Sequence, residues 1–334
     1  MKTLKVAGFY LALATVCPGL AVAAATKSPG IDQKTLTTQV LLDRLGFGPG
    51  VIDGQKGQSL VGAIKGFQES RGLPQSGKLD TDTTKALGAY AATPGTIEVT
   101  LSDADVAGPF VGPIPDDAAQ QAALPAMGYS DAMELLSERY HTTKATLIAL
   151  NSADTKLVAG TKIKVPNVRP AATDYAGTLK PEWRATLVGL NVSSEQPKAA
   201  KLVVDKSDRE LRVYDSQDKL VAQFPATMGS THDPLPIGTW KVQGVSPLPP
   251  FHYNPALFWD AKPGDEKQTI KPGPNGPVGV VWMDLDKDHY GIHGTENPET
   301  IGRTQSHGCI RLTNWDAARL SLMVKAGTPA VFQE

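Results

Sequence analysis

Residues that break helices are spread along the whole chain, and they limit its fold more than any other feature. The 334 residues include 32 glycines and 26 prolines. Proline ends a helix or a central strand, and glycine is the residue that tight turns favour. This pattern favours several short domains joined by turns and linkers over one long helical bundle, and a chain of this length is expected to hold more than one domain.

The charge balance of the chain narrows the range of its partners. Hydrophobic residues make up 41% and charged residues 20%, as in ordinary globular proteins. The formal net charge is -1. A chain without a basic excess has no general electrostatic attraction to nucleic acid or to an anionic membrane. We therefore expect no nucleic-acid partner.

The N-terminus has the pattern of an export signal. A positive start at Lys2 precedes an apolar stretch over 6–22, and small residues follow around Ala23. This order of basic, apolar and small residues is typical of a cleaved secretory signal. A membrane anchor is the alternative, and the break at Cys17–Gly19 argues against it. We expect residues 1–25 to be a signal peptide that exports the protein to the periplasm.

The chain has two cysteines, Cys17 and Cys309. Cys17 lies in the expected signal peptide, so the mature protein would keep Cys309 alone and would have no internal disulfide. A single thiol in an oxidising compartment is a candidate reactive group. A buried and inert thiol is the alternative from the cysteine count alone. The neighbours of Cys309 decide between the two.

Residues 34–92 show the pattern of three short helices. Apolar residues at helical spacing recur through this segment, and turn residues such as Asp53 and Gly54 separate the helices. The segment resembles the peptidoglycan-binding domain, a small three-helix fold. The residues that carry this resemblance are Leu41–Phe47, Ile52–Gly54, Gly66–Gln68, Gly72–Pro74 and Gly77–Asp80. A helical spacer without a ligand is the alternative, because the loop Gln55–Ser59 departs from the family pattern.

A Pro-rich segment, 93–122, is expected to be a linker that contains one strand, 96–101. Residues 123–168 then change to two short helices and a closing strand. This pattern resembles a degenerate LysM module, a small α/β fold, although the opening strand signature of that family is largely missing. A spacer specific to this protein is the alternative. A second linker is expected over 169–197.

Residues 198–334 have the pattern of a mainly β domain. Short β-rich runs fall at 202–204, 211–214, 221–227, 239–242, 278–283 and 291–293. A single late helix is expected over 315–324, after a cap at Thr313 or Asn314. The predicted fold class is multidomain, with a small three-helix domain, a small LysM-like α/β module and a mainly-β, β-sandwich-like C-terminal domain.

Two short motifs in this last domain carry the chemistry. The first is Tyr290–Thr295, and the second is Ser306–Arg311; His293 and Cys309 are sixteen positions apart. A thiol attacks only as the thiolate, and histidine titrates in the range that lets it take the proton. Attack on an amide creates an oxyanion that needs backbone N–H donors, and Gly308 permits the tight turn that gathers them. The two motifs contain what acyl transfer through a thioester requires.

These motifs, with Leu235–Trp240 and Ile301–Arg303, resemble the signature of the L,D-transpeptidase catalytic domain of the YkuD type. The resemblance covers 198–334 and implies that Cys309 is the nucleophile and His293 its base. The other roles it implies are orientation of His293 by the Gly294 carbonyl, an oxyanion loop that contains Ser306, His307 and Gly308, and substrate binding by Arg311 and Tyr290. The alternatives are a structural ion pair for Arg311, an ordinary turn residue at Ser306, and His307 as a second candidate base.

The resemblance also implies the reaction and its partner, peptidoglycan. Cys309 would attack the bond between a diaminopimelate-type residue and the following D-alanine of a tetrapeptide stem. An amine of a neighbouring stem would resolve the thioester as a 3-3 cross-link, and no cofactor is needed. Water as acceptor would make the enzyme an L,D-carboxypeptidase or endopeptidase, and a lysine of an outer-membrane lipoprotein would make it an anchoring enzyme. The sequence leaves these acceptors open.

A zinc site is the competing use of the histidines. His289 and His293 are four positions apart, as in helical zinc motifs. Residues 290–292 have the pattern of a strand, along which four positions span about 13 Å, too far to share one ion. The sequence therefore predicts no metal.

A long Pro-rich stretch, 246–277, precedes the first motif and contains Tyr253, Phe258 and Trp259. A loop of this kind beside a catalytic motif is expected to be a lid over the groove for the acyl donor. A rigid surface loop is the alternative.

Overall fold

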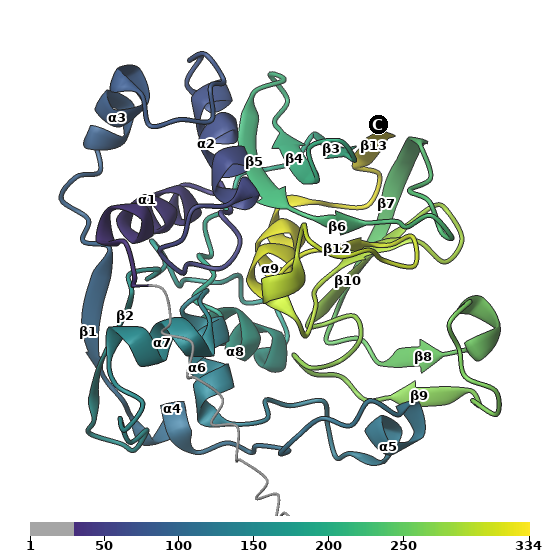
Figure 1. Cartoon of the computed structure of the whole chain (residues 1–334). Helices are drawn as coiled ribbons and strands as arrows, with labels where there is room; N and C mark the ends of the chain where they lie inside the picture. Colours follow the sequence, from purple (N-terminus) through teal and green to yellow (C-terminus); the bar gives the residue numbers. More distant parts are fainter. Residues whose placement is uncertain (1–29) are drawn as a thin grey trace, which may run out of the picture.

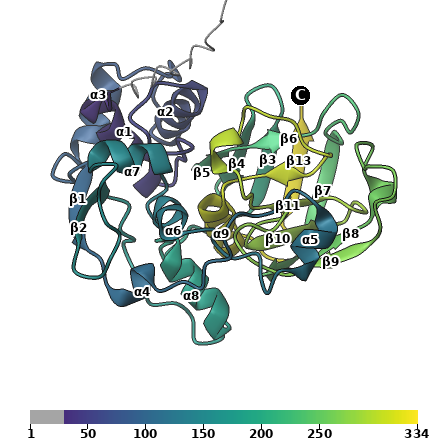
Figure 2. The ribbon, with the colours of Figure 1, turned by 60° about the horizontal axis from the view of Figure 1, so that its bottom comes forward.

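The computed structural model describes residues 30–334. The expected signal peptide, 1–25, and its Cys17 lie outside the described residues. Within residues 30–334, no helix has the length and hydropathy needed to cross a membrane. The described chain forms three units that pack against one another (Figures 1 and 2).

The first unit contains three helices: α1 (Gln33–Arg44), α2 (Gln58–Ser70) and α3 (Thr81–Gly88). Asp32 caps α1 by accepting the N–H of Thr35 at 2.6 Å, and Asp80 caps α3 by accepting the N–H of Thr83 at 2.9 Å. The three predicted helices are thus present, and two of them begin after an aspartate cap.

The second unit is a two-stranded antiparallel sheet with two helices. Its elements are β1 (Thr96–Thr100), α6 (Ala132–Arg139), α7 (Lys144–Leu150) and β2 (Lys162–Pro166). β1 pairs with β2 along its whole length, with Thr100 opposite Lys162. We expected this strand to lie in the linker 93–122, outside the module. The linker supplies the missing opening strand, so the unit begins at Thr96 and not at the expected boundary of residue 123.

A long excursion connects β1 to α6. It contains two short helices, α4 (Asp103–Val106) and α5 (Ala118–Ala123). α5 leaves the second unit and packs on β9 (Gln268–Ile270) of the third unit, as Figure 1 shows at its lower right. This part of the expected linker is therefore docked on another unit.

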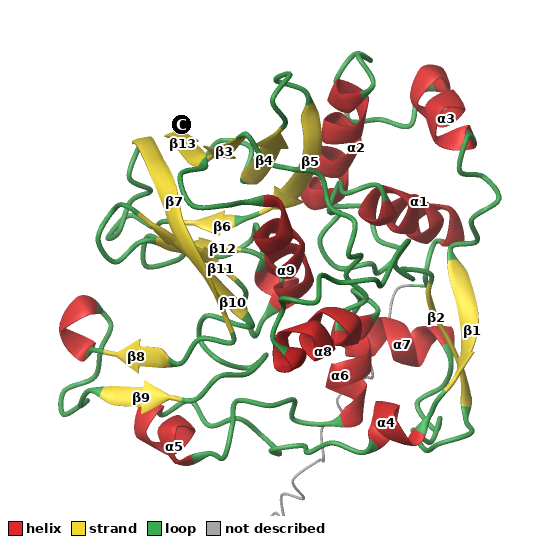
Figure 3. Ribbon diagram, turned by 180° about the vertical axis from the view of Figure 1, so that it is seen from behind, coloured by secondary structure: helices red, strands yellow, loops and turns green. Residues whose placement is uncertain are grey.

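The third unit is mostly β, as predicted. Its strands are β3 (Lys201–Asp205), β4 (Glu210–Tyr214), β5 (Leu220–Pro225), β6 (Thr227–Met228), β7 (Gly238–Pro247), β10 (Val281–Leu285), β11 (Gly291–His293), β12 (Ile310–Arg311) and β13 (Pro329–Gln333). They form one sheet in the order β5-β4-β3-β13-β7-β10-β11-β12-β6. β5 and β6 are the two edges, yet only Ala226 separates them in the chain. The sheet is therefore curled until its edges meet, and its two halves share β7 (Figure 3).

Two helices complete the core of the third unit. α9 (Asn314–Met323) begins after its Thr313 cap, as predicted, and its Trp315 is fully buried. α8 (Pro181–Gly189) lies in the segment 169–197 that we expected to be a linker. Its Trp183 and Leu187 are buried in the same hydrophobic core as the sheet, so this segment is part of the domain.

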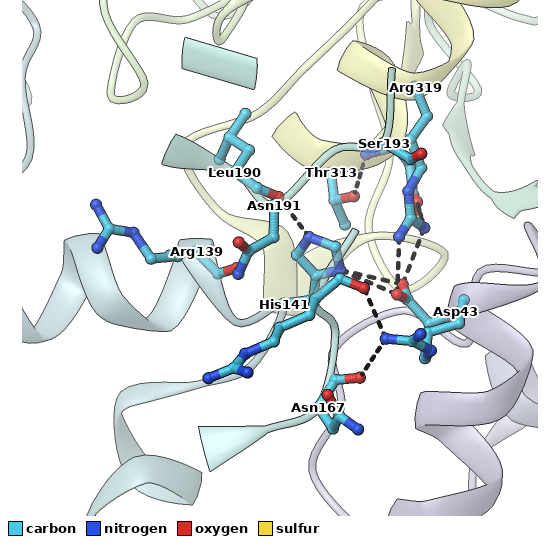
Figure 4. Close-up of polar contacts among 12 residues, drawn as sticks. Asp43, Arg139, His141, Asn167, Leu190, Asn191, Ser193, Thr313 and Arg319 are labelled. Carbon is cyan, nitrogen blue, oxygen red and sulfur yellow. Dashed lines mark hydrogen bonds and ion pairs between the residues drawn. The ribbon is translucent and has the colours of Figure 1, made fainter. Parts of the chain in front are cut away.

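All three units meet at one buried carboxylate, that of Asp43 in α1 (Figure 4). Arg319 of α9 donates to it through both terminal nitrogens at 2.9 and 2.8 Å, and Nδ1 of His141, which follows α6, lies 3.1 Å away. Nε2 of His141 faces the Leu190 carbonyl at 2.7 Å. Both ring nitrogens of His141 therefore face acceptor oxygens, one on the first unit and one at the end of α8.

Candidate active site

Two neighbouring parallel strands bring the chemical motifs together. His293 ends β11, and Cys309 directly precedes β12. The two strands are paired with His293 opposite Arg311. This pairing places His293, Cys309 and Arg311 in one cleft, although the sequence separates the motifs.

His293 is held as a neutral base. Its ring is buried, and Nδ1 donates to the Gly294 carbonyl at 2.7 Å. Because a carbonyl only accepts, Nδ1 carries the proton and Nε2 is left with its lone pair. Burial, followed by the charge of Arg311, lowers the pKa of His293 to about 3. The ring is therefore uncharged near neutral pH and can accept a proton. The acceptor is the Gly294 carbonyl, the group that we expected to orient His293.

Two glycines make room for this arrangement. A side chain on Gly291 would meet the Trp282 ring at 2.3 Å, and one on Gly294 would meet the Asn314 side-chain oxygen at 2.2 Å. The Trp282 ring stacks on His293 with ring centroids 5.4 Å apart. The imidazole of His293 is thus held by the Trp282 ring that stacks on it, and Asn314, the first residue of α9, packs against Gly294, whose carbonyl orients the imidazole.

Cys309 is half-buried and rests as a thiol. Its Sγ donates to the His289 carbonyl at 3.6 Å. Burial raises the pKa of Cys309, against smaller opposing effects of the Gly291 N–H and Arg311. A thiol in this state has to lose its proton to a base during attack.

The loop before Cys309 is shaped by Ser306. Its hydroxyl donates to the Cys309 carbonyl at 2.6 Å and accepts the N–H of Gly229 at 2.7 Å. Gly308 has a φ of 98°, which favours glycine. The Tyr290 ring packs against it so closely that a Cβ at this position would lie 2.7 Å from the ring. Ser306 thus ties the loop to Gly229, the residue that follows β6, which is more than an ordinary turn residue does.

The same loop presents free backbone donors. In the part of the chain that the structure describes, the N–H groups of His307 and Gly308 have no hydrogen-bond partner. Unpaired amides on a turn beside a nucleophile are the donors that an oxyanion requires.

His307 faces the predicted lid. Its Nε2 lies 2.9 Å from the Asp260 carboxylate, and its ring packs edge to face on Phe258 with centroids 5.0 Å apart. Its contacts with the lid distinguish His307 from His293, whose ring packs against the sheet.

Arg311 lies in the cleft with a guanidinium that is not ion-paired. Among residues 30–334, no carboxylate lies within ion-pair distance of it, and its Nε is buried without a hydrogen-bond partner. The alternative of a structural ion pair therefore has no support in the described chain. Tyr290 lines the same cleft and lies under the ammonium group of Lys287, 4.7 Å from the ring centroid.

The cleft has a volume of 880 Å³. One wall is the stretch 246–277 that we expected to be a lid. Within it, β8 (Phe251–Tyr253) and β9 form a two-stranded arm, and the short helix η1 (Pro255–Leu257) lies between them. Trp259 near its tip is 57% exposed.

A second wall of the cleft comes from the expected linker. Asp116, Asp117 and Gln121, at α5, line the cleft. The chain after α5 is fastened to the lid, because the Met127 N–H donates to the Pro272 carbonyl at 3.1 Å and the Met127 carbonyl accepts the Asn275 N–H at 3.0 Å. No local pattern in the sequence indicated that this segment reaches the active site.

Other side chains at the site were also missed. Trp282 belongs to the predicted strand 278–283, where alternation alone gives no sign that it stacks on His293. Asn314 and Asp260 act through folded contacts that leave no local signal. Among the described residues, no group of three or more histidine, cysteine or acidic side chains is placed to hold a metal ion.

Two family models match the chain. The model of the L,D-transpeptidase catalytic domain, YkuD, matches residues 199–332, and that of a peptidoglycan binding domain matches residues 32–87. A Bacillus licheniformis protein named as a candidate L,D-transpeptidase YkuD is 27% identical over 201 residues, covering 59% of this chain and 91% of that protein. A Fuscovulum blasticum protein, also named as a candidate L,D-transpeptidase, is 32% identical over 130 residues, covering 38% of this chain and 66% of that protein.

Solved structures overlap with part of the chain. The catalytic domain of the Enterococcus faecium L,D-transpeptidase is 21% identical, with a TM-score of 0.32, and the match covers 42% of this chain and all of that domain. The L,D-transpeptidase from Mycobacterium smegmatis is 23% identical, with a TM-score of 0.33, over 40% of this chain. The match spans 58% of the mycobacterial chain.

Proposed function

The chain carries an L,D-transpeptidase catalytic domain of the YkuD type and a peptidoglycan-binding domain, and on this premise we propose that it forms 3-3 cross-links in peptidoglycan through a thioester on Cys309. The acyl donor is a tetrapeptide stem. The observation that carries the proposal is the orientation of His293, whose Nδ1–H is held by Gly294 so that Nε2 is free to take a proton in the cleft that contains Cys309.

The first half-reaction forms the thioester. The Cys309 sulfur bonds to the carbonyl carbon between the diaminopimelate-type residue and D-alanine, and its proton passes to Nε2 of His293. The N–H groups of His307 and Gly308 stabilise the oxyanion. When the C–N bond breaks, His293 returns the proton to the leaving amine, and D-alanine departs.

The second half-reaction consumes the thioester. An amine of a neighbouring stem bonds to the same carbon, and the C–S bond breaks. His293 takes a proton from the attacking amine and returns it to the sulfur, so that Cys309 is again a thiol. Arg311, which is not ion-paired in the described chain, binds a carboxylate of the stem, and Tyr290 lines the donor groove.

The other parts of the chain suit an enzyme that works on the wall. We propose export through residues 1–25 to the periplasm, where the substrate lies. The order strand–helix–helix–strand of the second unit, with β1 paired to β2, supports its relation to the LysM fold. It would act as a second wall-binding module beside the first unit.

Purified protein without residues 1–25, incubated with disaccharide-tetrapeptides, tests the reaction. Mass spectrometry should find a dimer that has lost one D-alanine for each bond formed, and Cys309→Ala should give none. Disaccharide-tripeptide without dimer would instead assign the L,D-carboxypeptidase alternative. Cross-linking to a lipoprotein lysine in place of a stem amine would assign the anchoring alternative.

Acylation by a carbapenem tests the nucleophile alone. A strained lactam carbonyl is an acyl donor for a thiol held beside backbone donors. Intact mass spectrometry should show one added drug mass on the wild type and none on Cys309→Ala, with or without a chelator. An adduct that persists in Cys309→Ala, or one that a chelator prevents, contradicts the cysteine mechanism.

A further inference from the structure

A second cleft, of 660 Å³, lies between α2 of the first unit and the β3–β4 turn of the third. Ser59 and Gly62 of α2 form one wall, Arg209 and Glu210 the other, and Arg303 lies at the edge. We propose that this cleft binds a carboxylate-bearing peptide stem of peptidoglycan at a site separate from the catalytic cleft. This inference rests on the proposed function, because it takes peptidoglycan as the ligand.

Positive charge in this cleft is not neutralised by the protein. Lys65, Arg209 and Arg303 line it, and no carboxylate of residues 30–334 is within ion-pair distance of any of them. Arg212, which also lines the cleft, is instead paired with Asp205 and with Asp208, and Asp208 is a lining residue too. A cleft with a surplus of unpaired cations favours an anionic ligand, and guanidinium groups suit carboxylates.

Arg209 is held in place by its backbone conformation and by a hydrogen bond of its side chain. Its backbone has a φ of 58°, in the left-handed region that residues other than glycine rarely adopt. Its Nη1 donates to the Gly302 carbonyl at 2.7 Å, and Gly302 directly precedes Arg303, which lines the same cleft. Two cationic groups from separate segments therefore face the same space.

Glu210 supplies a second and independent sign of a ligand. The residue is 3% exposed, and its Oε2 is buried without a hydrogen-bond partner. Burial raises its pKa well above the ordinary value, against the charge of Arg212, which favours the protonated carboxyl with an O–H to donate. A buried polar group without a partner is costly, and a ligand carboxylate accepting from Glu210 removes that cost.

The shape of the cleft depends on close approach at Gly62. A side chain there would meet Oε1 of Glu210 at 1.9 Å, and the Gly62 carbonyl accepts Nε2 of Gln223 at 2.7 Å. The first unit and the third unit are thus in close contact at this cleft. Arg303 precedes Ser306 by three positions, so a stem bound here lies against the segment that leads into the catalytic loop.

The test uses Cys309→Ala protein that comprises all of residues 30–334, so that no chemistry occurs, and disaccharide-tetrapeptide as the probe. Backbone amide resonances of Gly62 and Arg209 report on the second cleft, and those of Gly294 and Gly308 report on the catalytic cleft. We expect saturable shifts at Gly62 and Arg209. Adding Lys65→Glu with Arg303→Glu should weaken the affinity reported there at least tenfold and leave the catalytic-cleft titration unchanged.

The control is Lys78→Glu with Lys85→Glu, which makes the same charge change on exposed residues of the first unit and should alter the affinity less than twofold. The inference is overturned if Gly62 and Arg209 do not shift, if the cleft variant binds like its parent, or if a probe with amidated carboxyl groups binds equally well. Equal displacement by inorganic phosphate would show a general anion site and would also overturn it. If a carbapenem fails to acylate the wild-type protein while the Cys309→Ala protein still binds the probe at Gly62, the proposed chemistry alone is rejected.

Discussion

The protonation state of each catalytic residue follows from its immediate surroundings. Burial and Arg311 keep His293 neutral, and the Gly294 carbonyl determines which nitrogen carries the proton. Burial keeps Cys309 protonated. Because both groups rest uncharged, the two residues form no thiolate–imidazolium pair at rest. In the proposed mechanism the proton therefore moves when the substrate carbonyl is attacked.

For single residues, we predict that His293→Ala lowers the rate of carbapenem acylation by at least about 1,000-fold. This is the order of magnitude expected when an activating base is lost. His307→Ala should lower the rate about tenfold or less, because His307 bonds to Asp260 of the lid. Stopped-flow fluorescence or timed mass spectrometry measures both rates.

Asp260→Ala is the matched control for His307→Ala. If His307 acts through the lid, the two variants should have similar effects, mainly on the concentration of drug that half-saturates the rate. Circular dichroism should show that all three variants are folded. Equal losses in His293→Ala and His307→Ala, or a larger loss in the latter, would exchange the two roles.

At the scale of elements, α6 of the second unit supports α9 of the catalytic unit through one buried acid. Asn314, which begins α9, donates to Glu138 of α6 at 2.9 Å, and the Tyr129 hydroxyl donates to the same carboxyl at 3.1 Å. Burial raises the pKa of Glu138 to about 8. Since Asn314 also packs behind Gly294, the contact joins the second unit to the support of His293.

The raised pKa of Glu138 predicts how stability depends on pH. Between its ordinary value of 4.5 and about 8, the folded state binds more protons than the unfolded state, so stability falls as pH rises. Each pH unit in this window lowers the free energy of unfolding by at most about 1.4 kcal/mol from this group. We expect Glu138→Gln to keep the contacts and to flatten the fall between pH 5 and 8.

Urea unfolding at pH 5, 6.5 and 8 measures this effect. Glu182→Gln, an exposed acid on α8, is the control and should follow the wild-type slope. If the free energy of unfolding of Glu138→Gln falls with pH as steeply as that of the wild type, Glu138 does not carry the proton in the folded state.

At the scale of the whole molecule, a single carboxylate links the three units. Asp43 of the first unit accepts from His141 of the second and Arg319 of the third (Figure 4). Burial acts to raise the pKa of Asp43, but Arg319 and then His141 hold it below its ordinary value. Its contribution to stability is therefore present above the unfolded pKa and is lost only in strong acid.

Removing the shared cation should destabilise the assembly of units. In Arg319→Met, the carboxylates of Asp43 and Asp316 stay buried without their guanidinium partner, and we expect a loss of about 3–5 kcal/mol in the free energy of unfolding. Arg184→Met, on the exposed face of α8, should change it by less than about 0.5 kcal/mol. Thermal or urea unfolding at pH 7 measures both.

The double variant Asp43→Asn with Arg319→Met separates charge from packing. It should recover part of the lost stability, because the buried negative charge of Asp43 is removed together with the positive charge of Arg319. A single-variant loss below 1 kcal/mol would mean that the cluster does not hold the units together.

The features that can be predicted from the sequence alone are local ones. Capped helices such as α3 and α9, the β-rich runs of the third unit, and the motifs around His293 and Cys309 depend on residue types at short spacing, and short spacing can be read along a chain. Gly308 was read as a turn residue for the same reason, and its φ of 98° requires glycine.

Contacts between distant segments could be found only from the folded structure. The pairing of β1 with β2, the docking of α5 at the cleft, and the contacts of Glu138 with Asn314 and of Asp43 with Arg319 each join residues far apart in the chain. Such contacts depend on how whole elements pack, since many pairs of apolar faces and buried polar groups are compatible with the same local pattern. For this reason the segments expected to be linkers proved to be a strand, a wall of the active site and a core helix.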